Sequence, residues 1–123
     1  MRSILLGVLL ASCAAPSVEI PPDAVPVVTY GELMLELSEH YCAEQADCGN
    51  IGGGAIARCV RHSVSHTCEL AQTCDIAVTQ ADVDRLAECV LQMDAITETK
   101  TGCNELLWGF TPDVCQPLYR LQD

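Results

Sequence analysis

The apolar positions of this chain recur at helical intervals. Between residues 30 and 47 they are spaced three, four and seven apart, the spacing of one buried helix face. They are Tyr30, Leu33, Met34, Leu37 and Tyr41, continued by Cys48. Thr29 and Glu32 have the spacing of a capping box, and Gly49 stands where a helix commonly ends in the left-handed conformation. The pattern predicts a first helix over about residues 30–47.

Two further segments have the same periodicity. The run 49–54 contains four glycines and predicts a turn between helices. A second helix is predicted from residue 54 or 55 to about 65, with one face formed by Ile56, Cys59, Val60 and Val64. Thr79, with Asp82 three residues later, signals the start of a third helix. The buried stripe expected on it is Val83, Leu86, Ala87, Val90 and Leu91.

The remaining segments are less regular. Residues 66–78 have no clear period beyond one helical turn near Leu70, and residues 95–102 are expected to form a threonine-rich loop. A short helix is predicted over 103–108, and Thr111-Pro112 is expected to open a final turn that contains Cys115. No segment alternates with a period of two. The sequence therefore predicts a mainly α fold, a small disulfide-stapled helical domain of three main helices plus short terminal turns.

The first thirteen residues have the pattern of an export signal. Arg2 precedes the apolar run Ile4–Leu10, which is far shorter than the ~20 residues of a membrane-spanning helix. Leu10-Ala11-Ser12-Cys13 resembles the lipobox of bacterial lipoprotein precursors. The resemblance implies removal of residues 1–12 and attachment of a diacylglycerol to the Cys13 thiol. The alternative is ordinary cleavage after Ala14, which would discard Cys13.

Proline dominates the segment that follows. Four prolines between residues 13 and 28 prevent helix formation and predict an extended spacer. The expected organisation is a lipoprotein signal peptide at 1–12, the lipidated cysteine and a proline-rich tether at 13–28, and a cysteine-rich helical domain at 29–123. By analogy with Gram-negative lipoprotein sorting, Ala14 in place of aspartate favours the outer over the inner membrane. We therefore expect an exported protein, lipid-anchored in the bacterial cell envelope.

The charge of the chain argues against two classes of partner. It has 17 acidic and 6 basic residues, a formal net charge of −11. Loss of residues 1–12 removes one arginine, which makes the net charge −12. Nucleic acid and anionic lipid surfaces are bound through basic residues that neutralise phosphates. We expect neither as a partner, and we interpret the acidity as an aid to solubility.

The cysteines indicate covalent stabilisation. The chain has nine, and assigning Cys13 to lipid leaves an even set of eight. These predict four disulfides in an exported chain, formed by Cys42, Cys48, Cys59, Cys68, Cys74, Cys89, Cys103 and Cys115. At ~2–4 kcal/mol each, four disulfides compare with the whole ~5–15 kcal/mol stability of a domain. Eight cysteines permit many pairings, and short connections favour Cys42 and Cys48 bridging to the second helix or the segment after it.

The overall layout resembles the small cysteine-rich lipoproteins of myxobacteria and their relatives. The resemblance rests on the lipobox cysteine, the proline-rich tether and three cysteine contexts: Tyr41-Cys42 with Cys48, Glu88-Cys89-Val90-Leu91, and Pro112-Asp113-Val114-Cys115. It covers most of the mature chain, but it consists of spacings rather than catalytic signatures. It implies an exported, tethered, disulfide-stapled helical domain, and it assigns no functional residue.

One stretch has the ligand types of a metal site. In Cys59-x-x-His62-x-x-x-His66-x-Cys68, two histidines four residues apart share a helix face between two thiols, a ligand set that suits zinc. Zinc requires thiolates, whereas an oxidising compartment pairs cysteines as disulfides. We therefore expect two disulfide cysteines with two surface histidines, and neither a metal nor a cofactor.

The other candidate features have structural interpretations. Trp108 and Phe110 flank Gly109 and are expected in a small buried satellite core, the alternative being an exposed recognition spot. Asp82, Asp84, Glu88 and Asp94 are expected on the solvated face of the third helix. The chain has no Gly-x-Ser-x-Gly elbow and no Cys-x-x-Cys motif, so we predict no catalytic residues.

These patterns favour a non-enzymatic binding or structural module in the cell envelope. Its expected partner is the membrane, through lipidated Cys13, and a protein partner is left open because no residue pattern identifies one. Two alternatives come from other classes. One is a thiol-active or metal-binding periplasmic protein, and the other is a secreted inhibitor or toxin-like scaffold.

Overall fold

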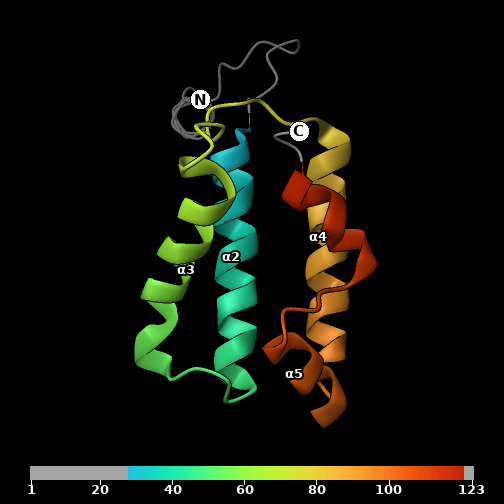
Figure 1. Ribbon diagram of the computed structural model, residues 1–123. Coiled ribbons are helices and arrows are strands. Elements are labelled where there is room, and N and C mark those ends of the chain that lie inside the picture. The colour runs from blue at the N-terminus through green and yellow to red at the C-terminus, as the bar shows by residue number, and fades with distance from the viewer. Residues whose placement is uncertain (1–27, 121–123) are drawn as a thin grey trace, which may run out of the picture.

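Helix α2 (Tyr30–Asp47) lies at the centre of the fold (Figure 1). The computed structural model describes residues 28–120 of the 123. The helix starts at a capping box in which the Thr29 hydroxyl accepts from the Glu32 amide at 3.2 Å and the Glu32 carboxylate accepts from the Thr29 amide at 3.0 Å. Its last residue is Asp47, Cys48 is the C-cap, and the next residue, Gly49, has φ +76°. The helix predicted over 30–47 is confirmed at both ends.

The second helical segment returns along α2 in the opposite direction (Figure 1). It consists of η1 (Gly53–Ala55), α3 (Ile56–Val64) and a π-helical turn, η2 (Ser65–Glu69). The predicted helix is confirmed, but it continues past its expected end near residue 65, so residues 66–69 are not irregular. Cys68 in this π-helical turn is fully buried and bonds to Cys74.

The connection from Leu70 to Thr79 crosses the first turn of α2. The amides of Tyr30 and Gly31 donate to the carbonyls of Ile76 and Cys74, at 2.7 and 2.8 Å. The first turn of a helix has amides without partners inside the helix, and this connection supplies carbonyls for two of them. Among residues 28–120, one isolated β-bridge, between Thr29 and Ala77, is the only strand-like pairing.

Helix α4 (Gln80–Ile96) runs parallel to α2 (Figure 1). The predicted start is confirmed, because Thr79 and Asp82 form a second capping box. The predicted buried stripe is only partly right. Leu86 is buried and Val90 packs against the core, but Ala87 is exposed and Leu91 is 65% exposed. Fully buried positions on α4 are instead Cys89 and Met93, and a disulfide from Cys89 to Cys115 holds that face inward.

The loop predicted over residues 95–102 is wrong. Helix α4 continues to Ile96, and α5 (Lys100–Leu107) begins after a connection of three residues. Thr99 caps α5, its hydroxyl accepting from the amide of Gly102 at 2.9 Å. A Cβ at Gly102 would overlap the carbonyl oxygen of Ile96, so the tight connection requires glycine there. The short helix expected over 103–108 is therefore confirmed but starts one turn earlier.

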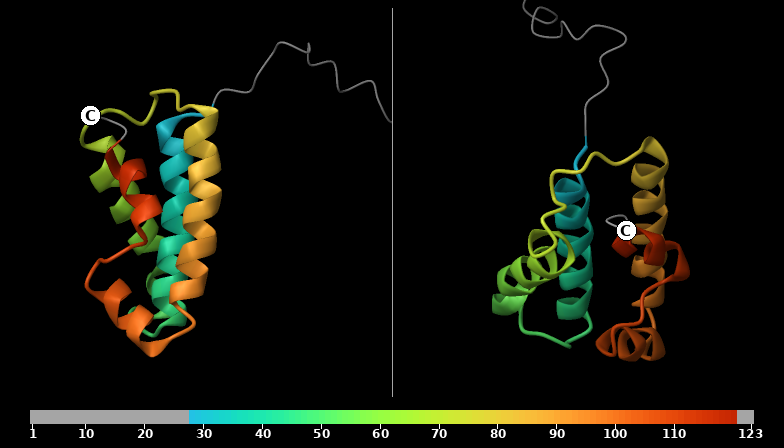
Figure 2. Two further views of the ribbon diagram at one scale, coloured as in Figure 1. Left: turned by 90° about the vertical axis from the view of Figure 1, so that its right-hand side faces the viewer. Right: turned by 45° about the horizontal axis from the view of Figure 1, so that its top comes forward.

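The C-terminal segment η3 (Asp113–Arg120) is a 3₁₀ helix that packs against α4. The final turn predicted around Cys115 is confirmed. Helices α2 and α4 form one layer and α3 and η3 the other, with α5 at the far end from Thr29 (Figure 2). The buried core between the layers comes from α2, η2, α4 and η3 and comprises Tyr30, Leu33, Met34, Leu37, Cys68, Leu86, Cys89, Met93, Cys115 and Leu118.

All eight cysteines of the described chain form disulfides, as predicted. The pairs are Cys42–Cys59, Cys48–Cys103, Cys68–Cys74 and Cys89–Cys115. The expected bridge from Cys42 to the second helix is confirmed. The same expectation for Cys48 is wrong, because Cys48 lies at the end of α2 next to α5 and bonds to Cys103, with 5.4 Å between the Cα atoms. The chain is a mainly helical small domain held by four disulfides.

Candidate functional site

A groove of about 410 Å³ lies between α3 and the C-terminal segment, with Tyr41 of α2 among its lining residues. The other residues that line it are Cys59, His62, Ser63, His66, Thr67, Gly109, Thr111, Gln116 and Tyr119. Its volume falls in the range of ~300–1,000 Å³ that is usual for ligand pockets. Side chains from three distant parts of the sequence thus form one concave surface.

The charge of this groove differs from that of the chain. None of the ten lining residues is an acid, whereas the chain has 17 acidic residues and a net charge of −11. A second hollow on the other side of α3 is lined by both Arg61 and Glu69. The first groove therefore combines aromatic rings with neutral or basic polar groups.

Three hydroxyls in the groove are each held by an internal hydrogen bond. Tyr41 accepts from the amide of Gln45 at 2.8 Å, and Gln45 is itself buried. Ser63 accepts from the hydroxyl of Ser38 at 2.8 Å, and Thr111 accepts from the amide of Gln116 at 2.7 Å. A hydroxyl has one proton to donate besides the bonds that it accepts. Each group is thus oriented by its donor and can still donate to a ligand.

Tyr119 adds a further hydroxyl. Burial, together with the neighbouring hydroxyls of Tyr41 and Tyr30, raises the pKa of Tyr119 to about 12. Its side chain is half-buried in the wall of the groove. The phenol therefore stays protonated throughout the physiological range and remains a hydrogen-bond donor.

Both cysteines of the metal-like stretch are bonded in disulfides. His62 and His66 do share one face, with ring centroids 5.2 Å apart and planes inclined by 26°. However, Cys59 bonds to Cys42, and the buried Cys68 bonds to Cys74. Across residues 28–120, no group of three or more histidine, cysteine or acidic side chains could hold a metal ion. The histidines are exposed, as expected, and line the groove.

Trp108 and Phe110 are exposed and are the sequence neighbours of Gly109, which lines this groove, although neither ring is itself a lining residue. Their exposed fractions are 74% and 64%, so the expected buried satellite core is wrong, and both rings are exposed. The fully buried position at this end of α5 is taken by Leu106. Between the two rings, Gly109 turns the chain with φ +85° and lines the groove. The only tryptophan and the only phenylalanine of the chain therefore flank a groove residue.

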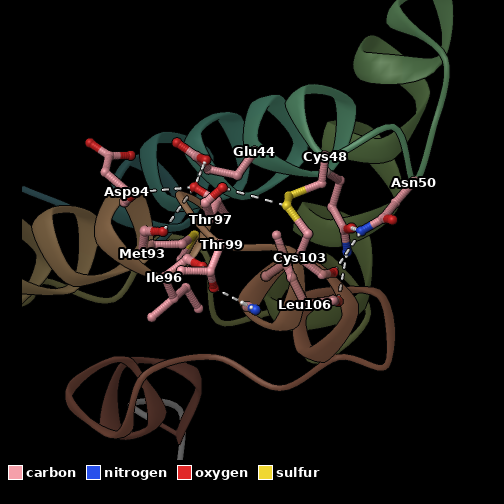
Figure 3. Close-up of a disulfide and its surroundings, with 12 residues drawn as sticks. Glu44, Cys48, Asn50, Met93, Asp94, Ile96, Thr97, Thr99, Cys103 and Leu106 are labelled. Atoms are coloured by element: carbon pink, nitrogen blue, oxygen red, sulfur yellow. Dashed lines mark hydrogen bonds between the residues drawn. A yellow bond between two sulfur atoms is a disulfide. The ribbon is translucent and has the colours of Figure 1, made fainter.

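A hydrogen bond between Thr97 and Glu44 links the end of α4 to α2 (Figure 3). Thr97 donates a short hydrogen bond to Glu44, and the carboxyl groups of Asp94 and Asp47 lie near enough to act on the charge of Glu44. Partial burial and the nearby acids Asp94 and Asp47 raise the pKa of Glu44 above its ordinary value, against the lowering effect of the Thr97 bond. The contact between the two helices therefore includes a carboxyl group that holds its proton more tightly than an exposed glutamate does.

The remaining candidates have structural roles. Asp84, Glu88 and Asp94 are exposed on α4, as predicted, while Asp82 is half-buried as part of the capping box. The run 49–54 connects α2 to α3, as predicted.

The signal peptide, the lipidation site at Cys13 and all of the tether except Val28 lie outside the described residues and stay predictions. Among the helices of the described chain, none is both long and apolar enough to span a bilayer.

Sequence reasoning missed the groove as a whole. Its lining residues at 41, 59–67 and 109–119 become neighbours only when α3 and η3 lie on the same side of α2. The available signal was the pair of aromatic residues around Gly109.

Comparisons of the chain with protein-family models, curated proteins and solved structures found no match.

Proposed function

We propose that this chain is an envelope-anchored lipoprotein whose helical domain acts as a non-enzymatic binding module. The observation that carries the proposal is that all eight cysteines of residues 28–120 are paired in four disulfides. Such density of disulfides is typical of proteins outside the reducing cytosol. It agrees with the export signal that the first residues predict.

The anchor in this proposal is a lipid on Cys13. The lipobox-like Leu10-Ala11-Ser12-Cys13 supports it, and the proline-rich tether would hold the domain away from the bilayer. Several acyl chains on one cysteine give stable attachment, whereas a single chain binds only marginally. The outer membrane is the proposed location, and the small cysteine-rich lipoproteins are the proposed relatives.

The position of the aromatic residues supports a binding role. The described chain starts at one end of α2, and α5 lies at the other end (Figure 1). Helix α2 has 18 residues, which span about 27 Å at ~1.5 Å per residue. Trp108 directly follows α5, so a tether at the start of α2 leaves this residue at the far end of the domain.

Intact-mass analysis of the protein extracted from membranes, with and without reductant, tests the proposal. We expect a mature chain that begins at Cys13, carries diacylglycerol and acyl masses, and gains two hydrogens per disulfide on reduction. Thiol titration of the denatured, unreduced protein should find no free thiol. A full-length chain with reduced cysteines in the cytosolic fraction would overturn the proposal. Two or more free thiols in the exported chain would instead favour a thiol-active protein.

A further inference from the structure

We infer that the groove between α3 and the C-terminal segment binds an uncharged glycan, with Trp108 and Phe110 as the aromatic surface at its edge. The inference rests on the proposed function as a binding module and names the ligand class of that module. Three observations support it. They are the two exposed aromatic rings next to Gly109, the hydroxyl groups that internal hydrogen bonds hold in place, and the absence of carboxylates from the groove.

The exposed rings provide the surface against which a sugar ring can stack. Sugars present flat faces of C–H groups, and aromatic side chains bind such faces by burying apolar area. Trp108 and Phe110 are 74% and 64% exposed, so both have free ring surface to cover. Neither ring is among the lining residues of the groove, so both are offered to a ligand that extends past its edge. Here, Gly109 between them lines the groove.

The hydroxyls of the groove match the acceptors of a sugar. Tyr41, Ser63 and Thr111 are held by internal donors at 2.8, 2.8 and 2.7 Å, and each still has its own proton to donate. A ligand that is rich in hydroxyl oxygens can accept all three bonds. Because these groups are held in place before binding, little ordering of side chains is required when the ligand enters.

Charge favours an uncharged ligand over an acidic one. The groove has no carboxylate, so an ammonium group would find no counter-charge there. A polyanion would approach a chain of net charge −11 and be repelled at long range. His62 and His66 supply polar ring nitrogens for hydroxyl groups, with no need for a charge on the ligand.

The fluorescence of Trp108 gives a direct test, because it is the only tryptophan of the chain. The mature protein with intact disulfides is titrated with neutral oligosaccharides of hexoses and of N-acetylhexosamines. Uronate oligosaccharides and inorganic phosphate are the charged probes. We expect a saturable blue shift of the emission with at least one neutral oligosaccharide, and none with the charged probes.

Variants locate the site. Phe110→Ala and Thr111→Val should each weaken binding by about tenfold, the effect of losing a stacking partner or one hydrogen bond. Leu91→Ala is the matched control, because Leu91 is 65% exposed on α4 and does not line the groove. Its affinity should equal that of the unchanged chain. Circular dichroism of each variant verifies the helical fold.

Three results would overturn the inference. They are no shift with any neutral oligosaccharide, a shift with uronate or phosphate alone, and equal affinities for Phe110→Ala, Thr111→Val and the unchanged chain. The mass analysis is independent of these titrations. A lipidated, fully disulfide-bonded protein that binds no sugar would leave the proposed module standing and remove the glycan.

Discussion

Cys48 at the end of α2 and Cys103 in α5 form a disulfide that closes a loop of 55 residues (Figure 3). The other three disulfides join residues that are 17, 6 and 26 positions apart. Next to it, Asn50 donates to the carbonyl of Cys103 at 3.1 Å, so the same two segments are also joined by a hydrogen bond. This link holds α5 against the end of the central helix.

The lengths of these loops predict unequal contributions to stability. In the chain-entropy model, closing 55 residues contributes about 4 kcal/mol and closing 6 contributes about 2 kcal/mol. Cys48→Ala with Cys103→Ala should therefore lower the urea midpoint more than Cys68→Ala with Cys74→Ala. Equilibrium denaturation of the two double variants measures the difference. The reverse order would show that packing around the buried Cys68 outweighs loop entropy.

The starts of α2 and α4 could be predicted because their signals are local. Thr29 with Glu32, and Thr79 with Asp82, form capping boxes within three residues of sequence. The rotation of α4 about its axis could not be predicted, because apolar residues occur on two neighbouring faces of this helix. The disulfide from Cys89 to Cys115 selects the face that is buried, and it joins segments 26 residues apart.

At the candidate site, too, local relationships could be predicted and long-range contacts could not. The neighbouring histidines His62 and His66 were predicted to share a face, because the helix alone determines that relationship. The burial of Trp108 and Phe110 was predicted wrongly, because apolar character does not tell which residue near a helix end reaches the core. Leu106 takes that position. The contact of Glu44 with Thr97 joins residues 53 apart and has no local signal.

The raised pKa of Glu44 predicts a pH-dependent component of stability. Its folded-state pKa lies above the ordinary value of 4.5, so the folded chain holds this proton more tightly than the unfolded chain does. The contribution of Glu44 to the free energy of unfolding is fully present below about pH 4.5 and is lost as the pH rises through the raised pKa. Glu44→Gln should therefore be more stable than the unchanged chain at pH 7 and similar to it in acid.

The control for this experiment is Glu36→Gln, which changes the net charge equally at an exposed position of the same helix. Urea midpoints of the three proteins, measured from pH 4 to pH 7, separate the local effect from general charge repulsion. If Glu36→Gln gained as much stability at pH 7 as Glu44→Gln, the partial burial of Glu44 and its acidic neighbours would not be the cause.

Gly102 is predicted to tolerate no side chain. A Cβ there would overlap the carbonyl of Ile96, at the point where α4 turns into α5. Gly102→Ala should destabilise the fold by about 1–3 kcal/mol, the usual effect of forcing an extra methyl group into a packed site. Thr101→Ala, at the exposed neighbouring position, should have little effect. Thermal unfolding compares them, and equal midpoints would mean that the connection can widen.

Tyr30 is predicted to hold the C-terminal segment in place. Its hydroxyl donates to the carbonyl of Leu118 at 2.8 Å in the buried core, across 88 residues of sequence. Tyr30→Phe keeps the ring but leaves that carbonyl without this donor, a loss of about 1–3 kcal/mol in the free energy of unfolding.

Because η3 is joined to the layer of α2 and α4 by this bond and by one disulfide, its amides should exchange with solvent faster in the variant. The amides of α3, which do not depend on the bond, should exchange at unchanged rates. Equal acceleration in both segments would indicate global destabilisation instead of a local release of η3.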